Sequence, residues 1–223
     1  YGGSVNFEST RLNKDEPSAE LQLLAGSFKT LRISSEVNTG RLKNDFAFYS
    51  RFTRTKSDGY KNHSGSDSYS YFFSGGHFGK KDVIKITAFT GKTQNDQSYL
   101  PVLLSNIREN PKTNYNHPND TDDFEQELIQ FQYSRILNPA WTSNSMFYYG
   151  GARGVFPFGI DNATQLLFGL KNNHYGFFSD VNYDNHTIDF TTGVHGYLFR
   201  RENYNSLAPN VAQPDYEDKT DKE

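Results

Sequence analysis

The stretch Thr187–Leu198, which reads TIDFTTGVHGYL, decides the class of fold. Apolar and polar side chains alternate along it. One face of an extended chain would carry Ile188, Phe190, Thr192, Val194 and Leu198. The opposite face would carry Thr187, Asp189, Thr191, Gly193 and His195. A period of two is that of a β-strand, since an amphipathic helix repeats apolar residues three and four positions apart. We therefore predict a strand with one apolar and one polar face.

The same alternation occurs in eight further segments. It is clear in 31–38, 129–134 and 174–183, and noisier in 19–26, 45–55, 68–78, 83–92 and 142–152. Helical periodicity is not sustained anywhere in the chain. The sequence thus predicts an all-β fold with about nine antiparallel strands between Ala19 and Arg200.

The connections between these segments alternate in length. Tight turns with Gly, Asn, Asp and Pro lie at 40–44, 79–82, 138–141 and 184–185. Long polar connections lie at 56–67, 95–123 and 153–173, and a polar tail follows Arg200. Short turns on one side and long loops on the other are typical of outer-membrane β-barrels, whose long loops are extracellular. We expect a partial antiparallel transmembrane β-barrel in a bacterial outer membrane, with its apolar strand faces toward lipid.

Composition agrees with this expectation. The mean hydropathy of -0.78 is low, but a barrel strand needs apolar side chains only at alternate positions. Aromatic residues make up 16% of the chain, and barrels carry such residues at both membrane interfaces. The net charge of -3 shows no basic stripe for nucleic acid, and the lack of cysteine excludes disulfides and thiol chemistry. No apolar run approaches the roughly 18 residues that a membrane helix needs.

The N-terminal residues carry a resemblance to a known family. The segment Tyr1–Thr10 contains Gly2-Gly3-Ser4-Val5-Asn6, which resembles the strand that closes the plug domain of TonB-dependent receptors. The segments 25–30, 36–40 and 54–60 look like the first barrel hairpins of Bacteroidetes-type members, and the resemblance continues through 73–92. The segment 172–203 resembles later strands of the same receptors. The resemblance implies a plug end and linker at residues 1–14 and the first part of a barrel at 15–223. The odd strand number and the charged segment 214–223 lead us to expect further strands after Glu223.

The resemblance also implies a function and its partners. An intact receptor of this kind imports a scarce large solute, such as a siderophore–iron complex, haem, cobalamin or an oligosaccharide. A TonB-type protein energises it through the plug, outer-membrane lipid surrounds it, and no cofactor or enzymatic activity is expected. Whether a lid lipoprotein covers the barrel stays open. Two alternatives also stay open: a small self-contained barrel with a structural or adhesive role, and a soluble glycan-binding β-sandwich.

Candidate solute-binding residues are aromatic residues of the long connections and histidines on polar strand faces. They are Tyr99, Tyr115, Phe156, Phe158, His174 and His195. No histidine pair has the spacing of a metal site, so we expect two hydrated lumen residues at 174 and 195. The acidic stretch Asn119–Asp123 lacks the spacing of a calcium loop and is expected to be solvated. No GxSxG or HExxH motif points to catalysis.

Overall fold

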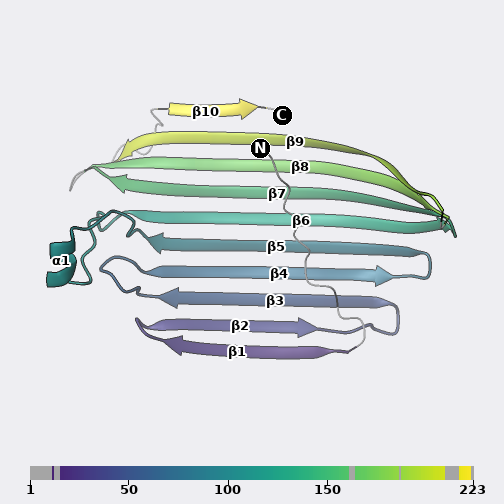
Figure 1. Ribbon diagram of the computed structural model, residues 1–223, viewed down its shortest axis with the longest axis horizontal. Helices are drawn as coiled ribbons and strands as arrows, with labels where there is room; N and C mark the ends of the chain where they lie inside the picture. The colour runs from purple at the N-terminus through teal and green to yellow at the C-terminus, as the bar shows by residue number, and fades with distance from the viewer. Residues whose placement is uncertain (1–11, 13–15, 161–163, 186, 209–215, 222–223) are drawn as a thin grey trace.

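The computed structural model describes residues 12, 16–160, 164–185, 187–208 and 216–221. They form one antiparallel ten-stranded sheet in which each strand pairs with the next along the chain (Figure 1). The strands are β1 Ser18–Gly26, β2 Thr30–Asn38, β3 Phe46–Ser57, β4 Ser66–Phe78, β5 Asp82–Asp96, β6 Thr121–Asn138, β7 Trp141–Gly159, β8 Gln165–Asp184, β9 Asp189–Ala208 and β10 Tyr216–Asp221. One short helix, α1 Leu104–Glu109, lies in the connection between β5 and β6.

The two ends of the sheet differ (Figure 1). At one end, called the turn end, short turns join β2 to β3, β4 to β5, β6 to β7 and β8 to β9. The other, called the loop end, carries α1 and the long connection 97–120. No helix in the described part of the chain is long and apolar enough to cross a membrane.

The predicted strands are confirmed, but several are longer than expected. Nine strands, β1 to β9, cover the predicted region, but β10 makes ten in the described part of the chain, so the expected odd number is wrong. The connection predicted at 153–173 is wrong, because β7 continues to Gly159 and β8 begins at Gln165. The tail predicted after Arg200 is also wrong in part, since β9 continues to Ala208 and β10 follows. The plug end predicted at residues 1–14 lies, apart from Leu12, outside the described residues.

One face of the sheet carries an apolar belt in its turn-end half. Register aligns Ile86, Phe131, Phe147 and Phe177 as neighbours across β5 to β8. The belt, as we use the term, consists of Leu21, Leu23, Ile33, Val37, Phe46, Phe48, Phe52, Tyr71, Phe73, Ile84, Ile86, Ile129, Phe131, Trp141, Phe147, Tyr149, Tyr175, Phe177, Tyr183, Phe190, Val194 and Leu198. The predicted division of 187–198 into two faces is therefore confirmed for the residues within β9.

Aromatic rings mark both margins of the apolar belt. Trp141 and Tyr183 lie 4.9 Å apart between ring centroids at the turn end, and Tyr149 and Tyr175 lie 5.0 Å apart toward the loop end. Trp141 to Tyr149 spans nine residues of β7. A tilted strand needs about 9–11 residues to cross a hydrocarbon layer. The belt therefore has the height that such a layer requires.

Beyond the belt, the same face becomes charged. Arg153 on β7 pairs with Glu125 on β6 at 2.8 Å, and Lys92 on β5 pairs with Asp123 at 3.0 Å. These residues occupy the same alternating positions as Phe147 and Phe131, closer to the loop end. The loop-end halves of the long strands therefore carry an exterior suited to water.

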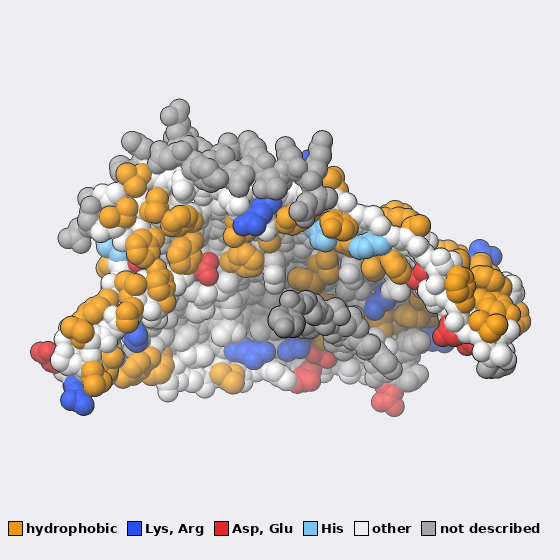
Figure 2. All heavy atoms as spheres, turned by 45° about the horizontal axis from the view of Figure 1, so that its top comes forward, with side chains coloured by type: hydrophobic (Ala, Val, Ile, Leu, Met, Phe, Trp, Pro, Cys, Tyr) orange, Lys and Arg blue, Asp and Glu red, His pale blue; other side chains and the backbone are white. Residues whose placement is uncertain are grey.

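Few hydrophobic side chains are buried in the described part of the chain. Only Leu12, Ala47 and Tyr49 are, whereas many belt residues are exposed, among them Leu23 and Phe147. Figure 2 shows many hydrophobic side chains on the surface of the molecule. Buried polar residues of the strands β2, β4 and β5 lie on the opposite face, which we call the polar face. There the hydroxyls of Ser34 and Thr53 are 2.8 Å apart. An exposed apolar surface this large marks a surface that contacts something apolar. Because all described strands form one sheet, the β-sandwich alternative does not fit.

Candidate ligand site on the polar face

A pocket of about 490 Å³ lies on the polar face near the loop end. Its apolar lining includes Phe124 of β6, Phe156 of β7, and Phe168 and Leu170 of β8. Two amide side chains of β9, Asn203 and Asn205, complete one wall. The pocket combines aromatic surface with hydrogen-bonding groups, as small-molecule sites do.

Strand register brings these side chains together. Phe156 lies opposite Phe168, which in turn lies opposite Asn205 on the next strand. At Gly154, an added Cβ would come within 3.0 Å of the ring of Phe124. The glycine therefore leaves room for this ring in the wall of the pocket.

The connection 97–120 is fastened beside this pocket. Asp120 is buried, with an exposed fraction of 2%. Its carboxylate accepts hydrogen bonds from the backbone N–H of Gly159 at 2.5 Å, the backbone N–H of His117 at 3.0 Å and the side-chain amide of Asn116 at 3.2 Å. The expectation of a solvated acidic stretch is thus wrong for Asp120, which ties the connection to the end of β7. Asp122 and Asp123 belong to β6.

Tyr99 is held next to the pocket by this arrangement. Its ring stacks on Phe156 with centroids 6.4 Å apart. Burial, followed by the negative charge of Asp120, raises the pKa of the Tyr99 hydroxyl above its usual value.

The same connection is braced from a second direction. The side-chain amide of Asn114 donates to the carbonyl oxygens of Asn62, His63 and Gln97 at 2.8, 3.0 and 2.9 Å. These bonds join the 97–120 connection to the one between β3 and β4. Tyr115 instead accepts a hydrogen bond from Asn106 of α1 at 2.6 Å and does not line the pocket.

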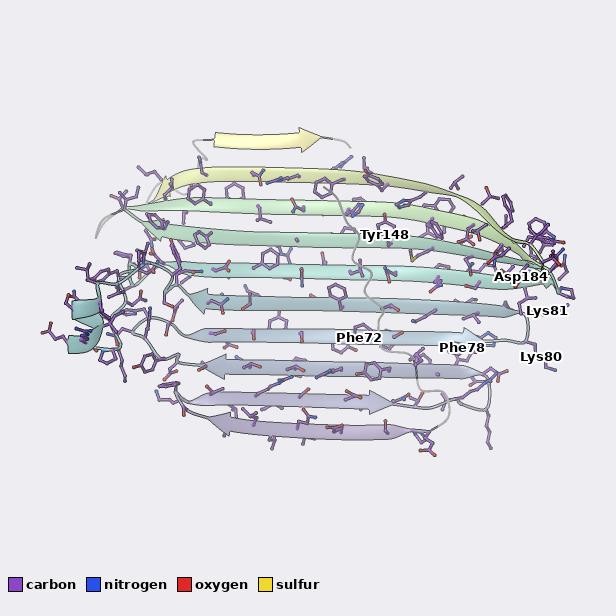
Figure 3. The ribbon with its side chains drawn as sticks, viewed as in Figure 1. Phe72, Phe78, Lys80, Lys81, Tyr148 and Asp184 are labelled. Atoms are coloured by element: carbon purple, nitrogen blue, oxygen red, sulfur yellow. The ribbon has the colours of Figure 1, made fainter. Side chains whose placement is uncertain are left out.

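The two candidate histidines share the polar face with the pocket. The hydroxyl of Tyr148, which Figure 3 labels, lies 3.0 Å from Nε2 of His195. The Tyr148 ring meets that of His174 edge-on, with centroids 5.2 Å apart. A Cβ at Gly176 would overlap the Tyr148 ring, so only a glycine at this position leaves room for the ring. His174 is six residues from Phe168 along β8, or about 20 Å. The histidines therefore form a separate cluster in the middle of the sheet.

The sequence predicted part of this site and missed part of it. Tyr99 and Phe156 do come together, whereas Phe158 lies opposite Leu166 at the end of the strand and does not line the pocket. Phe168 and Leu170 were missed because 153–173 was interpreted as a loop, and Phe124 because it falls between the predicted connection 95–123 and the predicted strand 129–134. The alternation of Leu166, Phe168 and Leu170 was the signal that could have revealed them. Among the described residues, no group of three His, Asp or Glu side chains is arranged to hold a metal ion.

The fold belongs to a known class of architecture. No protein-family model matches the sequence, and no curated protein is significantly similar to it. Solved structures with the same fold are outer-membrane import receptors, and the sheet corresponds to part of their β-barrel. At the identities found, this likeness establishes the fold.

Three of these structures illustrate the match. The ferric-catecholate import receptor Fiu from E. coli K12 has a TM-score of 0.71 and 12% identity, over 87% of this chain and 33% of the receptor. The ferric preacinetobactin receptor BauA from Acinetobacter baumannii has a TM-score of 0.72 and 10% identity, over 90% and 33%. The pyoverdine outer membrane receptor FpvA from Pseudomonas aeruginosa, bound to pyoverdine, has a TM-score of 0.65 and 11% identity, over 93% and 33%. The chain spans about a third of the length of these structures.

Proposed function

We propose that this chain forms part of the barrel wall of a TonB-dependent outer-membrane receptor that imports a scarce large solute. The observation that carries the proposal is the contrast between the two faces of one sheet. An apolar belt of membrane height covers one face, and a pocket with aromatic and amide side chains opens on the other. The likeness to solved import receptors supports the same assignment.

This proposal fixes how the sheet lies in the membrane. The apolar belt contacts lipid, and its aromatic margins lie at the two interfaces. The polar face lines the lumen, where His195 is exposed to water or solute and His174 is half-buried. The loop end is extracellular, so the pocket at Phe156 receives the solute where it enters the barrel.

A ferric siderophore is the solute that we favour over haem, cobalamin or an oligosaccharide. Fiu, BauA and FpvA are described as receptors for ferric catecholate, ferric preacinetobactin and pyoverdine. The rings of Phe156 and Phe168 offer stacking surface to a planar chelating group, while Asn203 and the Tyr99 hydroxyl offer hydrogen bonds. The energy comes from a TonB-type protein acting on a plug. The Bacteroidetes type rests on the sequence resemblance alone.

The proposal is tested by uptake of labelled solute into cells. A host strain lacking the gene, carrying the intact gene on a plasmid, is grown under iron limitation and given a panel of radiolabelled ferric siderophores. We expect uptake of one of them that stops when the TonB-type protein is removed. The variant Phe156→Ala should weaken binding, seen as a higher half-saturating concentration. The control Tyr60→Ala removes a loop aromatic that packs on Phe28 and does not line the pocket. Energy-independent uptake, or equal effects of both variants, would contradict the proposal.

A further inference from the structure

A second groove lies within the apolar belt, close to the turn end. It has a volume of about 530 Å³ and runs between β3, β4 and β5. Its walls are the side chains of Phe46, Phe48, Phe73, Ile84 and Ile86. At Gly75, which lies between these walls, an added Cβ would come within 2.7 Å of the Phe48 ring. The absence of a side chain there keeps the groove open, so it can accept an extended hydrocarbon chain.

Basic side chains gather where this groove meets the turn end. Lys80 and Lys81 form the turn from β4 to β5 and are exposed (Figure 3). Within the described part of the chain, neither ammonium group has an ion-pair partner. Lys81 directly precedes Asp82, and Lys80 follows His77 by three residues; both Asp82 and His77 line the groove. The two lysines therefore lie in the turn that joins β4 and β5, the strands that form two of the groove's walls.

The neighbouring turn adds to this positive charge. The guanidinium of Arg41 donates to the carbonyl oxygen of Phe78 at 2.9 Å and pairs with Asp45 at 2.9 Å. This places Arg41 against the end of β4, while Lys43 is exposed on the same turn. Within these two turns the acidic groups are Asp45, which pairs with Arg41, and Asp82, which lies opposite Arg135 in the strand register. Asp184, the last residue of β8, lies at the same end of the sheet (Figure 3). The two turns together keep a net positive charge.

We propose that this groove and the two lysines form a binding site for one anionic glycerophospholipid. An acyl chain occupies the groove, and the headgroup phosphate accepts hydrogen bonds from Lys80 and Lys81. The proposal rests on the function proposed above, because only a sheet that spans the membrane brings the turn end to the inner leaflet. Charge complementarity selects the occupant, since a zwitterionic lipid has the same chains but no net negative charge.

Native mass spectrometry of the detergent-extracted, delipidated protein tests this site. The protein is titrated with phosphatidylglycerol, with phosphatidylcholine of the same acyl chains, and with glycerol 3-phosphate. We expect one phosphatidylglycerol to bind in preference to phosphatidylcholine. The variant Lys80→Gln/Lys81→Gln should weaken phosphatidylglycerol binding by about tenfold or more. The control Lys61→Gln/Lys112→Gln removes the same charge from the loop end and should leave binding unchanged.

Each other outcome overturns the inference. Equal binding of both lipids would mean that the groove recognises only hydrocarbon, and binding of glycerol 3-phosphate would mean that the lysines hold a free phosphate. A dimer displacing lipid would make a second copy of the chain the occupant. An unchanged affinity in the Lys80/Lys81 variant would remove the headgroup site. If the protein fractionates with the outer membrane and its electrophoretic mobility changes on heating, these results contradict the lipid site alone. If it does neither, the proposed function fails with it.

Discussion

The turn-end and loop-end halves of the long strands share one continuous backbone but differ in the chemistry of their exterior. On β7, Phe147 has Phe131 and Phe177 as cross-strand neighbours. Six residues further along the same face, Arg153 has Glu125 and Lys171. The backbone hydrogen bonding is the same in both halves, so the surroundings of the strand decide the side chains. One strand can therefore face hydrocarbon along one half of its length and water along the other. On β7 the boundary between these two surroundings lies just beyond Tyr149.

The largest expected effect comes from placing a charge in the belt. Phe147→Arg replaces a side chain that contacts Phe177, with ring centroids 4.8 Å apart, in the middle of the belt. An arginine in hydrocarbon should lower the free energy of unfolding by about 2–4 kcal/mol. Reversible unfolding of the intact protein in bilayers measures this loss.

The matched variant lies on the same strand and face in the loop-end half. Val155→Arg should cost only about 0–1 kcal/mol, because water and Asp123 surround that position. Similar costs for the two variants would remove the distinction between the halves.

An intermediate effect is expected at Asp120, which acts locally. Asp120→Ala leaves the backbone N–H of Gly159 and of His117 without their acceptor. Each unsatisfied buried donor costs about 1–3 kcal/mol, and the loss should appear as opening of the 97–120 connection. Limited proteolysis should then cut this connection faster while the strands stay protected. Asn119→Ala is the control, since the neighbouring side chain is exposed. Equal cleavage of both variants would contradict the anchoring role.

The smallest effect is expected at an exposed ion pair of the loop-end half. Arg153→Leu breaks the pair with Glu125, whose distance is 2.8 Å. Exposed pairs contribute little to stability, so the unfolding midpoint should stay within the scatter of the measurement. A large decrease in the unfolding midpoint would mean that this pair lies in hydrocarbon, and that the belt extends further toward the loop end.

These two halves also explain what the sequence could predict. In the belt, most alternate positions are apolar, so segments such as 129–134 and 187–198 could be recognised by their period of two. In the loop-end half, both faces meet water and no such rule applies. Lys171, Asn172 and Asn173 therefore resembled a loop, although they continue β8.

Side-chain contacts that depend on strand register could not be predicted from the sequence, for a different reason. His174 and His195 could be assigned to one face from their own strands. The bond from Tyr148 to His195 depends on how β7, β8 and β9 align, which no single segment encodes. The anchoring of Asp120 depends on a partner 39 residues away. Local pattern therefore predicts faces, while pockets and anchors need the assembled sheet.

The most direct test of the account is the side of the membrane on which each end of the sheet lies. These 223 residues contain no cysteine, so an introduced cysteine is the only one among them, and the unsubstituted protein serves as the labelling control. Asn119→Cys marks the loop end and Lys80→Cys marks the turn end. An impermeant thiol reagent applied to intact cells should label the cysteine at 119, and the one at 80 only after the outer membrane is permeabilised. Labelling of both in intact cells, or of the turn end alone, would contradict a sheet that spans the outer membrane with its loops outside.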